Sequence, residues 1–365
     1  MKRKLLPLLI AGLTAASANI ALAGAPTVYG KVNVTVHKND FQSVAGGQAV
    51  DSTDNWSMES NASRLGVKGD YDVSADLKAI YKLEYEIAVD DGVNSNTREF
   101  SARNIYAGMQ GGWGTLIAGR NDTPLKLSQG EVDRFNDLPL ADIQNFMVGE
   151  NRADNMIMYS SPSFSGFNVT LGLVEGEDDG VTDGEDDDSL ADTISAAATY
   201  TNKMLYLALA MDSNMNESTD TIRFVGEVSF GPAKIGAIYQ TAEGNENYDV
   251  ISTVRGDLTS FDADIDPTAA TAVGFDEQDA YVLNGEVKLG GPWKLKAQYG
   301  YSESTTANGF DDAESTLMAL GIDYKLNDNA KLFAYYASLE TEGDSAFTDD
   351  TVEDKTLAVG FDFKF

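Results

Sequence analysis

Apolar and polar residues alternate along most of this 365-residue chain, in segments of about ten residues. The last segment places Leu357, Val359 and Phe361 at every second position, with small or polar residues between them. Because successive side chains of a β-strand point to opposite faces, this pattern predicts a strand with one apolar face. The alternation is also clear in residues 28–37, 77–87, 167–173, 205–211, 222–230 and 293–301. A period of two over such a length predicts an all-β protein.

Short and long connections alternate between these segments. The short ones consist of turn-forming residues and lie at 73–76, 111–114, 231–234, 291–294 and 327–329. The long ones are polar and often acidic, and cover residues 38–55, 90–98, 122–153, 175–192, 245–279, 303–315 and 341–354. Counting the segments between them gives about sixteen strands. We therefore expect a transmembrane antiparallel β-barrel with short periplasmic turns and long extracellular loops.

A water-soluble sandwich or propeller is the alternative explanation of this alternation. Such a protein has no reason to separate short and long connections so regularly, and its apolar faces would have to fill one common core. The aromatic residues beside short turns or the chain end instead suit a membrane interface. They are Tyr29, Trp113, Phe167, Tyr200, Phe230, Trp293, Tyr324, Phe363 and Phe365. A sheet that spans hydrocarbon must also close, because its backbone groups find no partner in lipid.

The first 23 residues have the three parts of a secretory signal peptide. Three cations, Lys2 to Lys4, precede an apolar run from Leu5 to Ile20, and the run closes on the small-x-small stretch 21–23. A lone transmembrane anchor is the alternative, and Pro7 and Gly12 inside the run disfavour it. We expect residues 1–23 to be removed, which leaves residues 24–365 as a single barrel domain.

Composition narrows the functions that remain. The net charge is −32, and it becomes −35 once the three cations of residues 1–23 are removed. Such a charge keeps the chain away from nucleic acid. The chain has no cysteine and one histidine, His37, so a thiolate or multi-histidine metal site is excluded. We expect neither a metal site nor a cofactor.

Four stretches resemble the Gram-negative general porins, in particular the sixteen-stranded trimeric porins of proteobacteria. They are SRLGVKG at 63–69, ARNIYAGMQGGWGTLIAGR at 102–120, NMIMYSSPSFSGF at 155–167, and the terminal aromatic strand. The resemblance implies a homotrimer in the outer membrane of a Gram-negative bacterium, in contact with lipid and lipopolysaccharide. It also implies that the assembly machinery of that membrane recognises Phe365. In this family the third long loop, here residues 122–153, folds into the lumen and forms an electrostatic constriction there.

The resemblance assigns basic residues to the wall of the constriction and acidic ones to the loop. Matching by motif gives Lys31, Arg64, Arg103 and Arg152 as the wall cations. The alternation independently turns Lys31 and Arg64 away from lipid, whereas Arg103 shares its parity with apolar residues and is ambiguous. The loop candidates are Glu131, Asp133, Asp137 and Asp142, of which we favour Asp133 and Asp137. The loop lacks the Pro-Glu-Phe-Gly-Gly stretch of better-known members, so the motif does not single out one carboxylate.

These features predict a general diffusion porin for ions and small hydrophilic solutes, and no enzyme. The ten carboxylates in residues 175–192 predict mild cation selectivity and loose binding of Ca²⁺ or Mg²⁺. A substrate-specific channel is the second interpretation, and a purely structural or adhesive barrel is the third. A barrel enzyme would depend on His37 with Asp40 nearby, and no nucleophile accompanies them.

Overall fold

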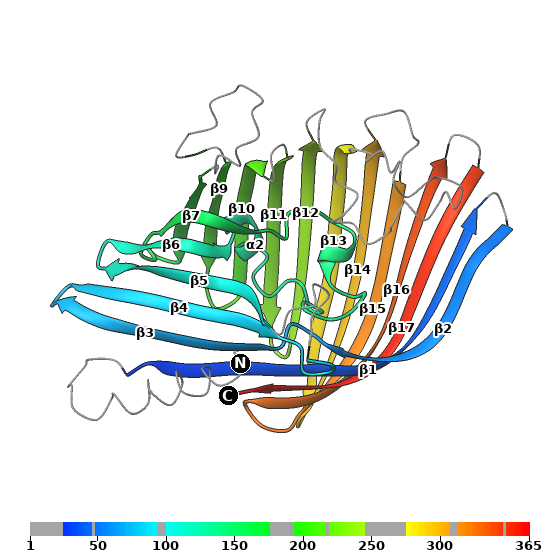
Figure 1. Cartoon of the computed structure of the whole chain (residues 1–365), viewed down its shortest axis with the longest axis horizontal. Helices are drawn as coiled ribbons and strands as arrows, with labels where there is room; N and C mark the ends of the chain where they lie inside the picture. Colours follow the sequence, from blue (N-terminus) through cyan, green and yellow to red (C-terminus); the bar gives the residue numbers. More distant parts are fainter. Residues whose placement is uncertain are drawn as a thin grey trace, which may run out of the picture.

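The computed structural model describes residues 25–45, 48–92, 100–175, 191, 193–215, 219–244, 275–306, 313–345 and 348–365. In these ranges seventeen strand segments form one antiparallel sheet (Figure 1). The strands are β1 (Thr27–Ala45), β2 (Gln48–Ser60), β3 (Arg64–Ser74), β4 (Leu77–Ile87), β5 (Phe100–Gly111), β6 (Gly114–Asp122), β7 (Arg152–Ser160), β8 (Phe167–Val174), β9 (Thr193–Thr201), β10 (Leu205–Met215), β11 (Thr219–Phe230), β12 (Ala233–Gly244), β13 (Phe275–Gly290), β14 (Trp293–Thr306), β15 (Ala313–Lys325), β16 (Ala330–Ser345) and β17 (Thr348–Lys364). Two short helical segments, α2 (Pro124–Leu127) and η2 (Ile143–Asn145), lie between β6 and β7.

The sheet closes on itself because its first and last strands pair. β1 and β17 are in register from Lys31↔Lys364 to Val44↔Thr351. On its other side β1 pairs with β2 along its second half and with β3 along its first residues. β2 and β3 are thus two parts of one barrel strand, interrupted at residues 61–63, where Ala62 has a φ of 47°. Counted this way, the described part of the chain forms the closed barrel of sixteen strands that the sequence predicts.

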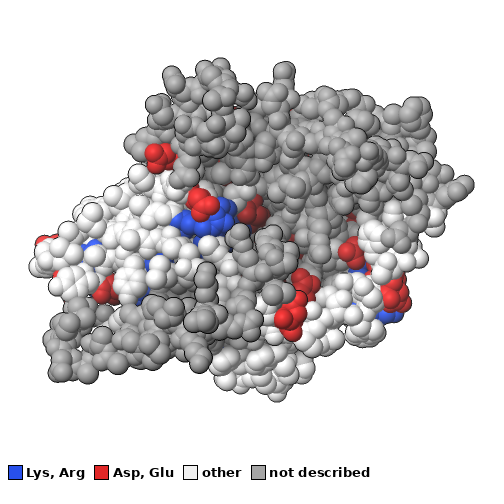
Figure 2. All heavy atoms as spheres, in the orientation of Figure 1, with Lys and Arg blue, Asp and Glu red and all other residues white. Residues whose placement is uncertain are grey.

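The two faces of each strand differ as the alternation predicts. In β10, Leu207 and Leu209 are exposed on the outside, whereas Ala208 and Asp212 are buried on the inside. Figure 2 shows one face of the molecule, where the charged side chains of the described residues form a few small groups beside white surface made of other residues. An apolar outer face and a polar inner face are what a barrel in lipid requires. Among the described residues, no helix has the length and apolar character needed to cross a membrane.

Aromatic side chains pair beside the short turns. Trp113 stacks on Tyr159 at 6.2 Å, and Trp293 meets Tyr324 edge-on at 4.6 Å between ring centroids. The prediction that Tyr29 belongs to this outer ring is wrong. Its hydroxyl donates to Glu84 across the inner face, because Tyr29 shares the inward parity of Lys31.

At the other end of the barrel several strands continue where the sequence suggested loops. β1 and β2 run through most of residues 38–55, and β16 and β17 through most of 341–354. At this end of strands β12 to β17, outward-facing carboxylates lie directly opposite one another. We call this row the acidic rim. Its cross-strand pairs are Glu243↔Glu277, Asp279↔Glu303, Glu303↔Glu314, Glu314↔Glu342 and Glu340↔Glu353. Like charges in such positions repel one another. The acidic rim nevertheless gathers them in one row and makes the extracellular end of the barrel negative.

The connection between β6 and β7, residues 123–151, lies inside the barrel, and we call it the inner loop (Figure 1). Its apolar residues are buried against the inner side of strands β10 to β17. The loop supplies Val132, Phe135, Leu138, Leu140, Ala141, Ile143, Phe146 and Met147, and the wall supplies residues that include Ala208, Val225, Ile238, Val282, Leu317 and Tyr335. Burial of this apolar surface holds the loop to one side of the lumen.

Candidate functional site

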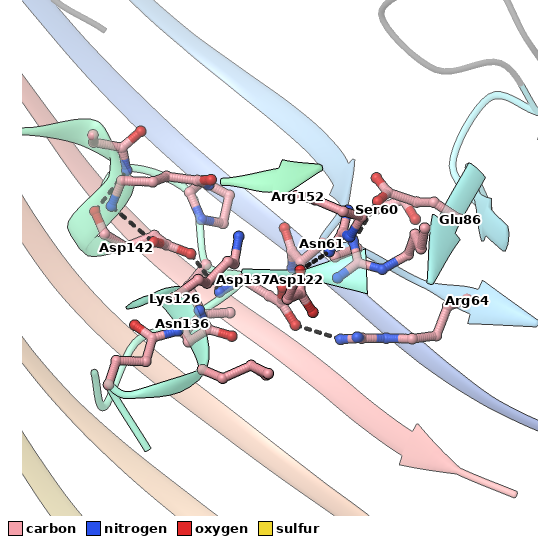
Figure 3. A pocket seen from close by; sticks show the side chains of 18 of the residues that line it. Ser60, Asn61, Arg64, Glu86, Asp122, Lys126, Asn136, Asp137, Asp142 and Arg152 are labelled. Carbon is pink, nitrogen blue, oxygen red and sulfur yellow. Dashed lines mark hydrogen bonds and ion pairs between the residues drawn. The ribbon is translucent and has the colours of Figure 1, made fainter. Parts of the chain in front are cut away.

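The inner loop and the wall of β2 to β7 line a cavity of about 500 Å³ (Figure 3). Its described charged side chains have both signs. The cations are Arg64, Arg103, Lys126 and Arg152, and the carboxylates are Glu59, Glu86, Asp122, Asp137 and Asp142. A lining of this kind is suited to water and small polar solutes rather than to an apolar ligand.

Asp137 joins the inner loop to the opposite wall. Its Oδ2 accepts from Lys31 Nζ at 2.9 Å and from Arg64 Nη2 at 2.5 Å. Lys31 and Arg64 are register partners on β1 and β3, so the two cations converge on one oxygen. Burial by itself would raise the pKa of Asp137, but these two cations hold it below its usual value. The structure therefore brings together three of the residues predicted for the constriction.

A tight turn points Asp137 toward the wall. Asp137 has a φ of 65° and Leu140 a φ of 61°, in the left-handed region that non-glycine residues seldom adopt. The amide of Asp137 donates to Asp142 Oδ2 at 2.7 Å, which stabilises the turn. No periodic pattern in the sequence marks such a turn.

A β-bulge resolves the ambiguous direction of Arg103. In the pairing of β4 with β5, Leu83 lies opposite Ile105 and Tyr85 opposite Ala102, so Arg103 and Asn104 together face the single residue between them. The extra residue reverses the parity of β5, and Arg103 points inward although the apolar residues after it point outward. Its Nη1 pairs with Glu86 Oε2 at 2.7 Å.

Arg152 lies at the start of β7, next to an irregularity in β6. Its Nη2 is 2.7 Å from Asp122 Oδ1, and its Nε donates to Asn104 Oδ1 at 2.9 Å. Arg103 and Arg152 thus line the cavity in ion pairs with acids of the wall itself. The expected pairing with loop carboxylates is found for Lys31 and Arg64 instead.

Asp133 and Asp142 serve the fold of the loop. Asp133 accepts from the amides of Phe135 and Ile143 and from Gln298 Nε2, at 3.0, 3.3 and 3.0 Å. Asp142 caps η2 by accepting from the amide of Gln144 at 3.0 Å. Burial raises the pKa of Asp133 to about 6 and that of Asp142 well above its usual value. Asp142 still borders the cavity, whereas the geometry does not favour Asp133 as a lining charge.

Glu131 lies away from the cavity. Its side chain is 76% exposed and pairs with Lys234 of β12 at 2.8 Å. Glu131 therefore pairs with a wall cation on the side of the loop that faces away from the cavity. Of the four loop acids proposed from the sequence, Asp137 alone contacts two wall cations in the described structure.

Several residues of the site were missed by the sequence analysis. The missed lining residues are Glu59, Glu86, Asp122 and Lys126. The alternation does contain a signal for Glu86, which shares the inward parity of Glu84 on β4. Asp122 is the last residue of β6, just after an irregularity in its pairing, and Lys126 lies beyond the strand in α2, so parity gives no information at either position.

No metal site emerges in the described ranges, where no three His, Cys, Asp or Glu side chains gather to hold an ion. Most of the acidic stretch 175–192 lies outside the described residues, as do residues 1–23. Loose Ca²⁺ or Mg²⁺ binding and the signal peptide therefore remain predictions.

The contact of Asp137 should survive mild acid. Because the pKa of Asp137 is lowered, its pairs contribute stability above the usual pKa of 3.8 and lose it as the pH falls through the lower folded value. The chain has no cysteine, so a nitroxide on Asn136→Cys reports the loop tip alone. We expect this label to stay immobile from neutral pH to about pH 4 and to become mobile below that. Release at about pH 5 to 6 would contradict the assignment.

Comparison with known proteins agrees with this geometry. A family model for Gram-negative porins matches residues 8–344. The chain is 26% identical to an outer membrane porin of Bordetella pertussis over 391 aligned positions, which cover 97% of both chains. It is 25% identical to outer membrane porin protein 32 of Delftia acidovorans, covering 77% of this chain and 75% of that one.

Solved structures show the same fold. An anion-selective porin from Comamonas acidovorans superimposes with a TM-score of 0.67 at 21% identity, covering 94% of this chain and 100% of that one. A trimer form of the outer membrane protein OmpT of Vibrio cholerae gives a TM-score of 0.59 at 19% identity, with 94% and 100% coverage. With a family match over most of the sequence, a closed barrel and a charged cavity inside it, the chain belongs to the Gram-negative porin family, as an outer-membrane channel and not an enzyme.

Proposed function

We propose that this porin is a general diffusion channel for ions and small hydrophilic solutes, with a mild preference for cations. The observation that carries the proposal is the mixed lining of the cavity, where Arg103 and Arg152 are each paired with a carboxylate of the wall. A site for one substrate would present a mostly apolar lining with a small number of precisely placed polar groups. Paired charges of both signs instead favour hydrated solutes in general.

The preference for cations follows from charge outside the cavity. Four cations and five carboxylates line the cavity in the described part of the chain, so its own field is nearly balanced. The acidic rim and the net charge of −32 of the whole chain draw cations to the extracellular end. Such fields fade over about 10 Å at 0.1 M salt, so the preference should weaken as salt is added.

A substrate-specific or anion-preferring channel is the second candidate. Arg64, Arg103 and Arg152 lie on one wall of the cavity, and a structural neighbour is named as an anion-selective porin. If solutes meet these arginines before their carboxylate partners, small anions would pass more readily.

A salt gradient across a planar bilayer separates the two candidates. We expect large ohmic single-channel steps and a reversal potential on the cation side, which moves toward zero at high salt. A reversal potential on the chloride side at low salt would favour the second candidate. Absent steps that return only with one solute would contradict general diffusion.

A homotrimer fits one feature of the outer surface. Arg120 of β6 and Asp154 of β7 form a 2.6 Å ion pair in line with outward-facing residues, well away from the short turns. Charge at that depth is costly in hydrocarbon, by about 2–4 kcal/mol for an Arg at the midplane, so a second copy is the natural cover. The trimer form of the Vibrio protein supports this assembly. Contacts with lipopolysaccharide, and with the assembly machinery through Phe365, belong to the same proposal.

A further inference from the structure

We propose that Arg223 and Arg134 are positioning residues, which hold the inner loop through two buried ion-pair sites on the side facing away from the cavity and so fix the width of the channel. This inference rests on the proposed function, in which the inner loop borders the path of the solutes. Neither arginine lines the cavity, and neither follows from the motifs of the sequence.

Arg223 of β11 ties both ends of the inner loop to one point of the wall. Its side chain is fully buried, and its Nη1 lies 2.7 Å from Glu150 Oε1 near the end of the loop. The same guanidinium donates to the carbonyl of Leu125 at the start of the loop, at 3.4 Å, and to that of Val148, at 3.3 Å. Gln240 of β12 accepts from its Nε at 2.8 Å. One cation therefore joins segments that are more than twenty residues apart in the loop.

Arg134 makes the reverse connection, from the loop to the wall. Its side chain is 4% exposed, and its guanidinium pairs with Glu227 of β11 and with Glu286 of β13. Its backbone is held too, because its amide donates to Gln298 Oε1 at 3.0 Å and its carbonyl accepts from Lys296 Nζ at 2.9 Å. The two ion-pair sites thus have opposite polarity, one with the arginine on the wall and one with it on the loop.

The position of Asp137 depends on these contacts. Asp137 follows Arg134 by three residues and is fixed by the tight turn described above. A shift of the backbone at Arg134 therefore moves the carboxylate that reaches Lys31 and Arg64. A buried guanidinium without its carboxylate is strongly unfavourable. Both ion-pair sites should therefore break in the same step when the loop leaves the wall. The ion pairs of Arg223 and Arg134, on the side of the loop that faces away from the cavity, therefore set the width of the channel.

The test compares Arg223→Gln with Arg223→Lys, which keeps the charge, and with Lys325→Gln. Lys325 is the control, because its 2.5 Å ion pair with Asp328 in the turn after β15 has a similar length and involves no residue of the inner loop. Each refolded channel is measured for single-channel conductance and open-channel noise, and for the mobility of a nitroxide on Asn136→Cys. For Arg223→Gln we expect roughly a twofold change in conductance, frequent sublevels and a mobile label. Arg223→Lys should lie closer to the parent, and Lys325→Gln should match it.

Label mobility separates failure of this inference from failure of the proposed function. A parent protein that does not conduct would overturn general diffusion, while the label would still show whether Arg223 holds the loop. If Arg223→Gln keeps the parental conductance and an immobile label, the positioning role is wrong. Should Arg223→Gln fail to fold, Glu150→Gln removes the same pair from the side of the loop, and Arg134→Gln removes the second ion-pair site. An immobile label in both variants would equally overturn the inference.

Discussion

Replacing Asp137 by Asn should turn the selectivity of the channel toward anions. The change leaves Lys31 and Arg64 in the lumen without the carboxylate that both contact, at 2.9 and 2.5 Å. A unit charge at about 4 Å in water is worth about 1 kcal/mol, which corresponds to roughly a fivefold rise in the local concentration of monovalent anions and a roughly fivefold fall in that of cations. Reversal potentials of the parent and of Asp137→Asn in the same salt gradient measure this effect.

Glu131→Gln is the matched control for this experiment. It removes one negative charge from the same loop, but Glu131 pairs with Lys234 and does not line the cavity. We expect its reversal potential to stay near that of the parent. Equal shifts in the two variants would mean that ions respond to the total charge of the loop and not to the contact at Asp137.

Phe135→Ala should release the inner loop while the barrel stays closed. Phe135 is fully buried between the loop and the wall, with the ring of Tyr335 at 6.0 Å and Lys296 Nζ at 4.2 Å from its centroid. Truncating a buried Phe to Ala costs about 3–5 kcal/mol, because apolar burial is lost and a cavity remains. The pairing of β1 with β17 does not involve this side chain, so the loss falls on the docking of the loop.

Limited proteolysis and single-channel recording report the two parts separately. We expect cleavage within residues 123–151 and an altered, noisier conductance, whereas the barrel itself stays folded and uncleaved. Phe230→Ala is the control, because Phe230 is 48% exposed on the outer face. If Phe135→Ala unfolds the whole barrel, the loop and the wall form one cooperative unit and the expectation is wrong.

The inward direction of Lys31 and Arg64 could be predicted because a strand has a strict period of two. The same rule fails for Arg103, since the bulge in β5 adds one residue that no composition or motif reveals. The loop acids could not be ranked for a different reason. A loop has no period, and Asp133 and Asp137 differ only through a turn and through contacts with distant strands.

Contacts between distant residues also explain why Arg223 was missed. It pairs with Glu150 across 73 positions of the chain, and nothing near either residue marks the other. The alternation contains a signal for the direction of Arg223, because it lies between Ile222 and Phe224, which point outward. What the sequence alone lacks is the part of the lumen that the loop fills, because that follows from packing across the barrel.

The packing of the inner loop constrains the order in which the parts of the barrel assemble. The loop is made between β6 and β7, yet its apolar side packs on strands β10 to β17, which come later in the chain (Figure 1). Until those strands pair, the apolar side of the loop has no surface to pack on, and Arg134 and Glu150 lack their ion-pair partners on β11 and β13. Contacts between segments so far apart form slowly, because the chain between them must first be ordered. A newly closed barrel should therefore pass through a stage in which its channel is wide and not yet constricted. Narrowing of the channel by the loop should be a late event in its maturation.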